Sequence, residues 1–226
     1  MSKVVAIVQA RTNSSRLPGK VLMDFGGAPM LSQIINQVRD ASLMSELVVA
    51  TTVSQTDDLI VDICKQNKVF VYRGSENDVL GRMTEAARSA NADIVIRLTA
   101  DNPFVNSDLI NEGISHFLRG YPLFDYVSNA DSADFPLGLN VEIMKFEALS
   151  IVNELDQTLD GREHVTSAFR RQPNSFKVHN FGTSLYFANK FLTVDTKEDY
   201  ARLLPLYQSL ISKRQFFTLS DIACLT

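Results

Sequence analysis

The residues best suited to chemistry lie in a basic segment near the start of the chain. Arg11, Arg16 and Lys20 fall within ten residues, among hydroxyl and amide side chains. The segment follows an apolar run at residues 4–8, which predicts a buried strand. Loops at the carboxyl ends of such strands bind ligands in α/β proteins, and three cations there favour a polyphosphate. Because Val21 follows Lys20 and no G-x-G-x-x-G pattern is present, the loop is neither a Walker A motif nor a dinucleotide fingerprint. The alternative is a solvated basic loop.

Two carboxylates stand where they could share one cleft with this loop. Asp101 follows an apolar run at residues 94–98, and Asp195 follows a strand-like segment at residues 191–194. Phosphate oxygens together with carboxylates suit Mg²⁺, a hard ion that takes oxygen ligands. The alternative is that Asp195 or Thr196 caps the next helix.

The elements that must position these residues follow a βαβαβαβ pattern. Continuous apolar runs predict strands covered on both faces, at residues 4–8, 47–50, 69–72 and 94–98. Between them, Pro29 can open a helix, Thr56 can cap a second, and Ser75 resembles the start of a capping box. In the second helix, Leu59 and Ile60 are expected on the buried side. We therefore expect a mostly parallel, doubly wound sheet with right-handed crossovers.

The second half of the chain is less regular. Strands are expected at residues 125–129, 139–144 and 191–194, and helices at 146–155 and 163–171. The Pro- and Gly-containing stretch 131–138 is expected to be a loop. A helix should begin at Thr196, and Pro205 should kink or split it. We see no repeat, low-complexity tract or linker, so a single domain is expected.

Composition excludes several classes of protein. The 226 residues are 45% apolar and 21% charged, which excludes disorder, collagen and coiled coil. No apolar run approaches the roughly 20 residues of a membrane helix, and the first run is too short for a signal peptide. Cys64 and Cys224 fit no metal spacing and suggest reduced thiols. The net charge of −4 argues against a nucleic-acid binder. We expect a cytoplasmic protein with no membrane and no nucleic-acid partner.

Seven stretches of the chain, in order, resemble one family of enzymes. They are residues 11–20, 73–80, 97–103, 125–129, 138–142, 162–166 and 192–196. The basic loop resembles the phosphate-binding signature of the CMP-sugar synthetases, which include the 3-deoxy-manno-octulosonate and acylneuraminate cytidylyltransferases. The full set is most similar to the spore-coat polysaccharide cytidylyltransferase branch. The resemblance covers nearly the whole chain.

The resemblance implies a single-domain α/β nucleotide-diphospho-sugar transferase fold, Rossmann-like, that uses CTP and Mg²⁺. The anomeric hydroxyl of a sugar acid, of 2-keto-3-deoxy or nonulosonic type, would attack the α-phosphorus and release pyrophosphate, for polysaccharide or glycoconjugate biosynthesis. Residues 1–105 would bind the nucleotide, residues 106–195 the acceptor, and residues 196–226 would form C-terminal helices. A homodimer is compatible with this reading. The rivals are a glycosyltransferase of related fold and a nucleotide-binding module without turnover.

The resemblance also implies roles for individual residues. Arg11, Lys20 and Asp101 would be catalytic, and Asp101 and Asp195 would hold the metal. The nucleotide-binding set is Ala10, Arg11, Arg16, Lys20, Arg73 and Thr99. Thr99 stands where the octulosonate enzymes have Gln, so their reading of cytosine at that position does not carry over. For the acceptor we expect Asn140, Glu142, Arg162 and His164, because an Arg suits a planar carboxylate. His164 could read a hydroxyl, act as a base, or be structural.

Overall fold

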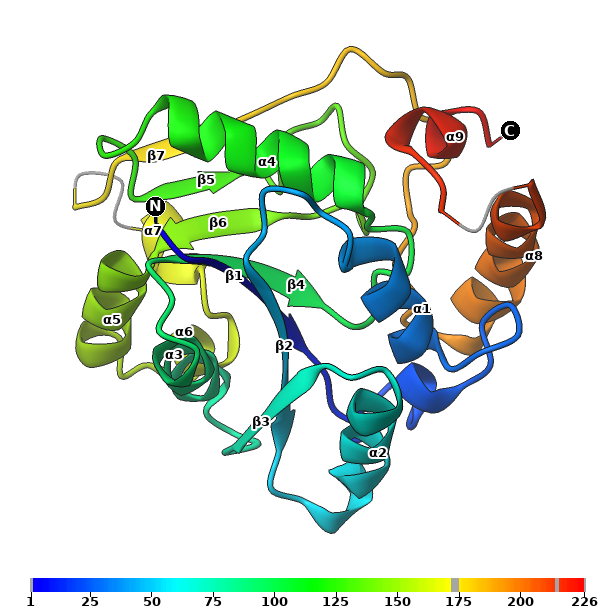
Figure 1. Ribbon diagram of the computed structural model, residues 1–226, viewed down its shortest axis with the longest axis horizontal. Coiled ribbons are helices and arrows are strands. Elements are labelled where there is room, and N and C mark those ends of the chain that lie inside the picture. The colour runs from blue at the N-terminus through cyan, green and yellow to red at the C-terminus, as the bar shows by residue number, and fades with distance from the viewer. Residues whose placement is uncertain (1, 172–174, 214–215, 226) are drawn as a thin grey trace.

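A mixed β-sheet forms the centre of the protein (Figure 1). The computed structural model describes residues 2–171, 175–213 and 216–225. Within them the sheet has seven strands in the order β3-β2-β1-β4-β6-β5-β7. Their bounds are β1 Val4–Gln9, β2 Glu46–Thr52, β3 Phe70–Gly74, β4 Ile94–Thr99, β5 Tyr126–Ser128, β6 Glu142–Lys145 and β7 Val178–Asn180. Strands β1 to β4 are parallel, whereas β6 runs antiparallel to both β4 and β5. The expected mostly parallel sheet is confirmed.

Helices cover both faces of this sheet. The longer ones are α1 Met30–Val38, α2 Asp58–Gln66, α3 Val79–Ser89, α4 Ser107–Arg119, α5 Phe146–Leu155 and α8 Lys197–Lys213. The short ones are η1 Lys20–Leu22, η2 Gln55–Asp57, α6 Leu159–Glu163, α7 Ser167–Arg171 and α9 Leu219–Ala223. Figure 1 shows α3 and α5 on one side of the sheet and α1, α2 and α8 on the other. Accordingly, Val5 and Ile7 of β1 belong to one hydrophobic core, and Ala6 and Val8 to the other.

The register of the central strands brings the ends of β1 and β4 together. Gln9, the last residue of β1, pairs with Thr99, the last residue of β4. Because parallel strands end at the same edge of a sheet, the loops that follow β1 and β4 leave side by side. The basic loop and Asp101 therefore start from neighbouring positions.

The first-half strands lie where the sequence predicts them, but the helix starts differ in detail. Pro29 stands just before α1, as its N-cap. Neither Thr56 nor Ser75 caps a helix. Asp78 caps α3 by accepting a hydrogen bond from the Gly81 N–H at 2.8 Å. Leu59 is 58% exposed, contrary to expectation, because α2 turns only Ile60, Ile63 and Cys64 inward.

The structure differs from three expectations for the second half. Residues 191–194 pair with no strand and make an isolated bridge between Phe191 and Leu137. Of the helix expected at residues 163–171, residues 167–171 form α7, residues 164–166 are not helical, and Glu163 is the last residue of a separate short helix, α6. Helix α8 is not split at Pro205, which lies inside the helix at an exposed position. The sequence analysis also missed α4, α6 and β7, whereas α8 and α9 fall within the C-terminal helices expected over residues 196–226.

Two further findings concern the whole described chain. No helix in the described ranges is both long and apolar enough to cross a lipid bilayer. Cys64 and Cys224 are both free thiols, and burial raises the pKa of Cys64 to about 12.

Candidate active site

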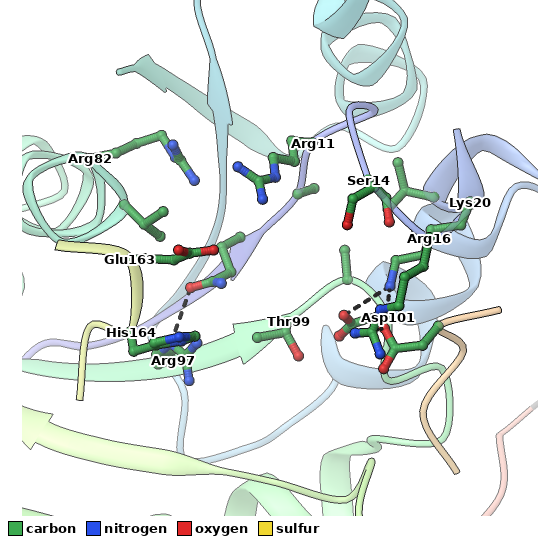
Figure 2. Close-up of a pocket in the computed structure, with 17 residues that line it drawn as sticks. Arg11, Ser14, Arg16, Lys20, Arg82, Arg97, Thr99, Asp101, Glu163 and His164 are labelled. Carbon is green, nitrogen blue, oxygen red and sulfur yellow. Dashed lines mark hydrogen bonds and ion pairs between the residues drawn. The ribbon is translucent and has the colours of Figure 1, made fainter. Parts of the chain in front are cut away.

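Lys20 brings the two predicted carboxylates together. Its Nζ donates hydrogen bonds to Asp101 Oδ2 at 3.1 Å and to Asp195 Oδ1 at 3.0 Å. A third hydrogen bond, of 2.8 Å, goes to the Val194 carbonyl. The Lys20 side chain is 8% exposed, so this contact is largely shielded from water. Two acids that lie far apart in the sequence thus contact a single ammonium group (Figure 2).

Asp195 reaches this position although the segment before it is not a strand. The Val194 N–H donates to the Asp101 carbonyl at 2.9 Å, which ties residues 191–195 to the loop after β4. Asp195 does not cap α8. Thr196 and Asp199 do so, because the Thr196 hydroxyl accepts from the Asp199 N–H and the Asp199 carboxylate accepts from the Thr196 N–H. The Asp195 carboxylate therefore remains available to the cleft.

A cavity of about 340 Å³ opens beside these carboxylates (Figure 2). We call it the large cavity to distinguish it from a smaller one of about 200 Å³ that adjoins it. Several sequence-predicted residues line it: Ala10, Arg11, Arg16, Lys20, Thr99, Asp101, His164 and Asp195. Others that the sequence analysis missed line it too: Gln9, Ser14, Ser15, Arg82, Arg97 and Glu163. Arginines and Lys20 outnumber the acids among these lining residues, so the cavity favours an anionic ligand.

Arg82 is the most informative of the missed residues. Its side chain comes from α3, is 4% exposed, and donates through Nη1 to the carbonyls of Ser75 and Glu76. Among the described residues, its buried Nε has no hydrogen-bond partner. Figure 2 shows its guanidinium and that of Arg11 pointing toward one another. Burial and the charge of Arg11 lower the pKa of Arg82. Two like charges with an unused donor favour an anion between them.

Asp57 fixes the loop that carries Arg11. Its carboxylate is 1% exposed and accepts from the Thr12 N–H at 2.8 Å and the Thr12 hydroxyl at 2.6 Å. It also accepts from the Thr51 hydroxyl and from the Thr52 N–H and hydroxyl. Burial raises the pKa of Asp57, but these hydrogen bonds outweigh burial and hold it below its usual value. Asp57 is also the N-cap residue of α2, which its place beside Thr56 in the sequence indicates, but nothing local reveals its partner Thr12, 45 residues away.

Two of the predicted residues line neither the large cavity nor the smaller one beside it. Arg73 donates to the carbonyls of Thr52 and Ser54 and pairs with Asp58 at 2.7 Å, so it braces the loop after β2. Arg162 pairs with Asp78 and donates to the Asn153 carbonyl at 2.9 Å. Neither lines the cavity. Arg73 and Arg162, which we expected to bind the nucleotide and the acceptor, thus contact loop and helix residues of the protein itself in this structure.

Asn140 and Glu142 line a smaller neighbouring cavity of about 200 Å³. It shares Arg97, Thr99, Asp101 and Asp195 with the large one. Glu142 is buried and paired with Arg97, and it accepts hydrogen bonds from the hydroxyls of Tyr126 and Thr166 at 2.6 and 2.5 Å. Burial raises its pKa, but the Arg97 charge and these hydrogen bonds bring the pKa below its usual value. Glu142 therefore holds Arg97 in place.

His164 lies at the rim of the large cavity. It follows α6 directly, its side chain is 60% exposed, and its Nε2 is 3.7 Å from Asp160 Oδ1. The break between α6 and α7 puts Glu163 and His164 beside the cavity together.

The polar groups of the cleft suit a hard cation whose remaining coordination positions are filled by a bound ligand. No cluster of three or more His, Cys, Asp or Glu side chains able to hold a metal occurs in the described part of the chain. Asp101 and Asp195, with the Val194 carbonyl, already surround one positive charge, the Lys20 ammonium. Mg²⁺ is commonly held by one or two carboxylates together with substrate phosphates and water. The donor set fits that pattern.

The comparisons with known proteins agree on one protein family. Residues 5–218 match a family model described as cytidylyltransferase. An uncharacterized protein of Methanocaldococcus jannaschii is 35% identical over 90% of this chain and 83% of its own length. The spore coat polysaccharide biosynthesis protein SpsF of Bacillus subtilis is 35% identical over 92% of this chain and 88% of its own. A 3-deoxy-manno-octulosonate cytidylyltransferase of Trichlorobacter lovleyi is 36% identical over 51% of this chain and 45% of its own.

Solved structures share the fold over nearly the whole chain. A cytidylyltransferase from Leptospira borgpetersenii superposes with a TM-score of 0.88 at 30% identity, over 99% of this chain and 91% of that one. A CMP:2-keto-3-deoxy-manno-octonic acid synthetase complexed with CTP has a TM-score of 0.72 at 17% identity, over 92% of this chain and 99% of that one. At 17% identity, the match to this second structure shows a shared fold and nothing more.

Proposed function

Because the chain belongs to the cytidylyltransferase family and is thus a nucleotidyltransferase, we propose that it transfers CMP from CTP to a sugar acid. The attacking group would be the anomeric hydroxyl of a 2-keto-3-deoxy or nonulosonic acid, and pyrophosphate would leave. SpsF is named for spore coat polysaccharide biosynthesis, and the relative from Trichlorobacter lovleyi is named for 3-deoxy-manno-octulosonate. A CMP-activated sugar for surface polysaccharide or glycoconjugate assembly is consistent with both names.

One observation carries the proposal. Asp101 and Asp195 meet at a single cation, and the basic loop after β1 borders the same cavity. Nucleotidyl transfer needs little covalent help from the protein, so positioning and charge neutralisation supply most of the catalysis. This cleft brings together the groups that such a reaction requires.

Asp101 and Asp195 are the residues that would hold Mg²⁺. The fit rests on the acceptors that already surround the Lys20 ammonium, which are two carboxylates and a carbonyl. When bound, the ion would polarise the α-phosphate and lower the pKa of an attacking hydroxyl.

The remaining roles belong to the residues around the large cavity. Arg11 and Arg16 supply cations for the phosphate oxygens, and Ser14 and Ser15 supply hydroxyl donors. Ala10 directly follows β1, Thr99 ends the neighbouring strand β4, and both would face the nucleoside. Arg82 adds a buried cation to the same wall. Together these groups orient the triphosphate and neutralise the charge that develops on the leaving pyrophosphate.

The acceptor would occupy the side of the cleft nearest Asn140. The smaller cavity there adjoins both metal-binding candidates and contains Arg97, a cation suited to a sugar carboxylate. Glu142 acts on the acceptor side by fixing Arg97, and His164 faces the acceptor or nucleotide from the rim of the large cavity. In this proposal residues 1–105 bind the nucleotide and residues 106–195 bind the acceptor, while α8 and α9 are the C-terminal helices.

Pyrophosphate release tests the proposal. Purified protein with CTP and Mg²⁺ is assayed against a panel of 2-keto-3-deoxy and nonulosonic acids, with neutral sugars as the control panel. Release that depends on one sugar acid supports the proposal. Sugar transfer from a CMP- or UDP-sugar would identify a glycosyltransferase instead. CTP-dependent thermal stabilisation without turnover on any compound would identify a nucleotide-binding module.

A further inference from the structure

The Lys20 ammonium satisfies all of its hydrogen bonds inside the protein. An ammonium group carries three N–H donors. Three protein oxygens accept them, on Asp101 at 3.1 Å, Val194 at 2.8 Å and Asp195 at 3.0 Å. In this arrangement no N–H remains for a phosphate oxygen. Lys20 therefore occupies the cation position and cannot at the same time bind a triphosphate.

Arg16 strengthens this internal neutralisation. Its Nη2 lies 2.9 Å from Asp195 Oδ1, the same oxygen that accepts from Lys20. Two carboxylates brought to one point repel each other unless a cation lies between them. The chain supplies that cation itself, from the loop that lines the nucleotide cavity.

We propose that Lys20 is a placeholder for the divalent ion, so that the ion and the nucleotide triphosphate bind as a coupled pair. This inference rests on the proposed function. The ammonium and a divalent ion compete for the same oxygens of Asp101 and Asp195. Lys20 leaves them at low cost only when new acceptors are available, and phosphate oxygens in the adjoining cavity are such acceptors. By linkage, each ligand raises the affinity for the other by the same factor.

The local structure permits the displacement. Lys20 begins the short η1 helix, directly after Gly19, whose φ of 73° lies in the left-handed region that favours glycine. Its side chain borders the 340 Å³ cavity, so the ammonium can turn from the carboxylates toward that space without leaving the cleft. The same flexible side chain then serves two sites in succession, first the carboxylates and then the phosphates.

Manganese binding to the free protein tests the proposal without any nucleotide. Mn²⁺ is titrated into the full chain, and free Mn²⁺ is followed by electron paramagnetic resonance. We expect Lys20→Met to bind Mn²⁺ about tenfold or more tightly than the unmodified protein, within the usual range of coupling between two ligands. Adding Asp101→Asn to Lys20→Met should abolish that gain. If Lys20→Met binds Mn²⁺ no more tightly than the unmodified protein, the proposal is wrong.

Two control variants separate displacement from a general change of charge. Lys65→Met makes the same substitution at an exposed pair with Asp62 and should leave the Mn²⁺ affinity within about twofold. Arg16→Gln removes a cation that is 64% exposed but touches only one of the two carboxylates. We expect it to tighten Mn²⁺ by less than about fivefold, as for a screened ion pair. An effect of Arg16→Gln equal to that of Lys20→Met would mean that charge alone is responsible and would overturn the proposal.

A crystallographic measurement covers the case in which Lys20→Met does not fold. Crystals of the unmodified protein are soaked with Mn²⁺ alone and with Mn²⁺ and CTP together. We expect an anomalous peak between Asp101 and Asp195 only with CTP, with Lys20 Nζ moved onto a phosphate. A peak with Mn²⁺ alone, beside an unmoved Lys20, would contradict the proposal. Absence of turnover with every sugar acid would contradict the proposed function instead, and the nucleotide-free titration is independent of that outcome.

Discussion

The Asp57 carboxylate accepts hydrogen bonds from both the backbone N–H and the hydroxyl of Thr12, and so ties the loop after β1 to the end of β2. Thr12 directly follows Arg11, which borders the large cavity. A buried carboxylate therefore fixes one side of the loop to which we assign phosphate binding. Unlike Lys20, Asp57 does not line that cavity.

Asp57→Ala should destabilise the protein strongly. The substitution leaves buried donors on Thr12, Thr51 and Thr52 without an acceptor, which costs about 2–4 kcal/mol of unfolding free energy. Urea unfolding at neutral pH measures the loss. Asp58→Ala is the matched control, because Asp58 is the next residue and its side chain, which pairs with Arg73, is 58% exposed. We expect that control to change the unfolding free energy by about 1 kcal/mol or less. Equal effects of the two variants would refute the anchoring role.

Glu142→Gln should remove an acid-sensitive contribution to stability. The pKa of Glu142 is lower in the folded protein than the ordinary value of 4.5. The ionised form is thus stabilised by folding, and its contribution is present above pH 4.5 and lost as the pH falls through the folded pKa. Because the variant leaves Arg97 without its buried partner, we expect it to lose about 3 kcal/mol at pH 7.

The difference between Glu142→Gln and the unmodified protein should shrink in acid, as measured by urea unfolding at pH 7 and at pH 4 and below. Glu147→Gln serves as the control, because Glu147 is exposed on α5. A loss of stability that is the same at every pH would show that Glu142 stabilises the protein through the packing of its side chain and not through its charge.

Asp101→Asn and Asp195→Asn should each abolish most turnover while preserving the fold. Each variant keeps the size of the side chain but removes a charge that meets Lys20. By analogy with the removal of one group that stabilises charge in a transition state, we expect a loss of about 100-fold or more in kcat/KM. Asp108→Asn, at an exposed position in the first turn of α4, is the control. A loss of less than tenfold, with unchanged unfolding, would mean that these residues are not the metal ligands.

Substitution of Arg82 should lower the affinity for CTP, whereas substitution of Arg73 should mainly lower stability. Arg82→Gln removes a buried cation from the cavity wall, so we expect the affinity for CTP to fall by about tenfold or more. Arg73→Gln removes a brace of the loop after β2 and should leave the affinity for CTP within about threefold while lowering stability. Calorimetric titration of CTP, with unfolding measured in parallel, compares the two. A larger loss of CTP affinity in Arg73→Gln would restore the assignment made from the sequence.

The sequence by itself determined the framework of this protein. Continuous apolar runs mark β1, β2 and β4, because a strand covered on both faces needs apolar side chains at every position. The run at residues 69–72 also marks a strand, β3, but this strand lies at the edge of the sheet and is only partly buried, contrary to expectation. Parallel strands end at one edge, so the basic loop and Asp101 could be placed at the same cleft from order alone. These features depend on neighbours in the chain and on a general rule of topology.

Tertiary structure decided which polar side chains meet. The sequence places Asp57 at a helix start, and Asp57 is indeed the N-cap residue of α2, but the sequence does not show that the same carboxylate also holds Thr12. Arg73 looks like a ligand contact in the sequence, yet its side chain braces the loop after β2. Residues 191–194 have the composition of a strand but find no strand partner, and Asp195 still arrives at Lys20. The physical reason is the separation in sequence between the residues that interact. Apolar burial is recorded in local periodicity, whereas the partner of a buried charge is chosen by close contacts between segments that only the folded chain brings together.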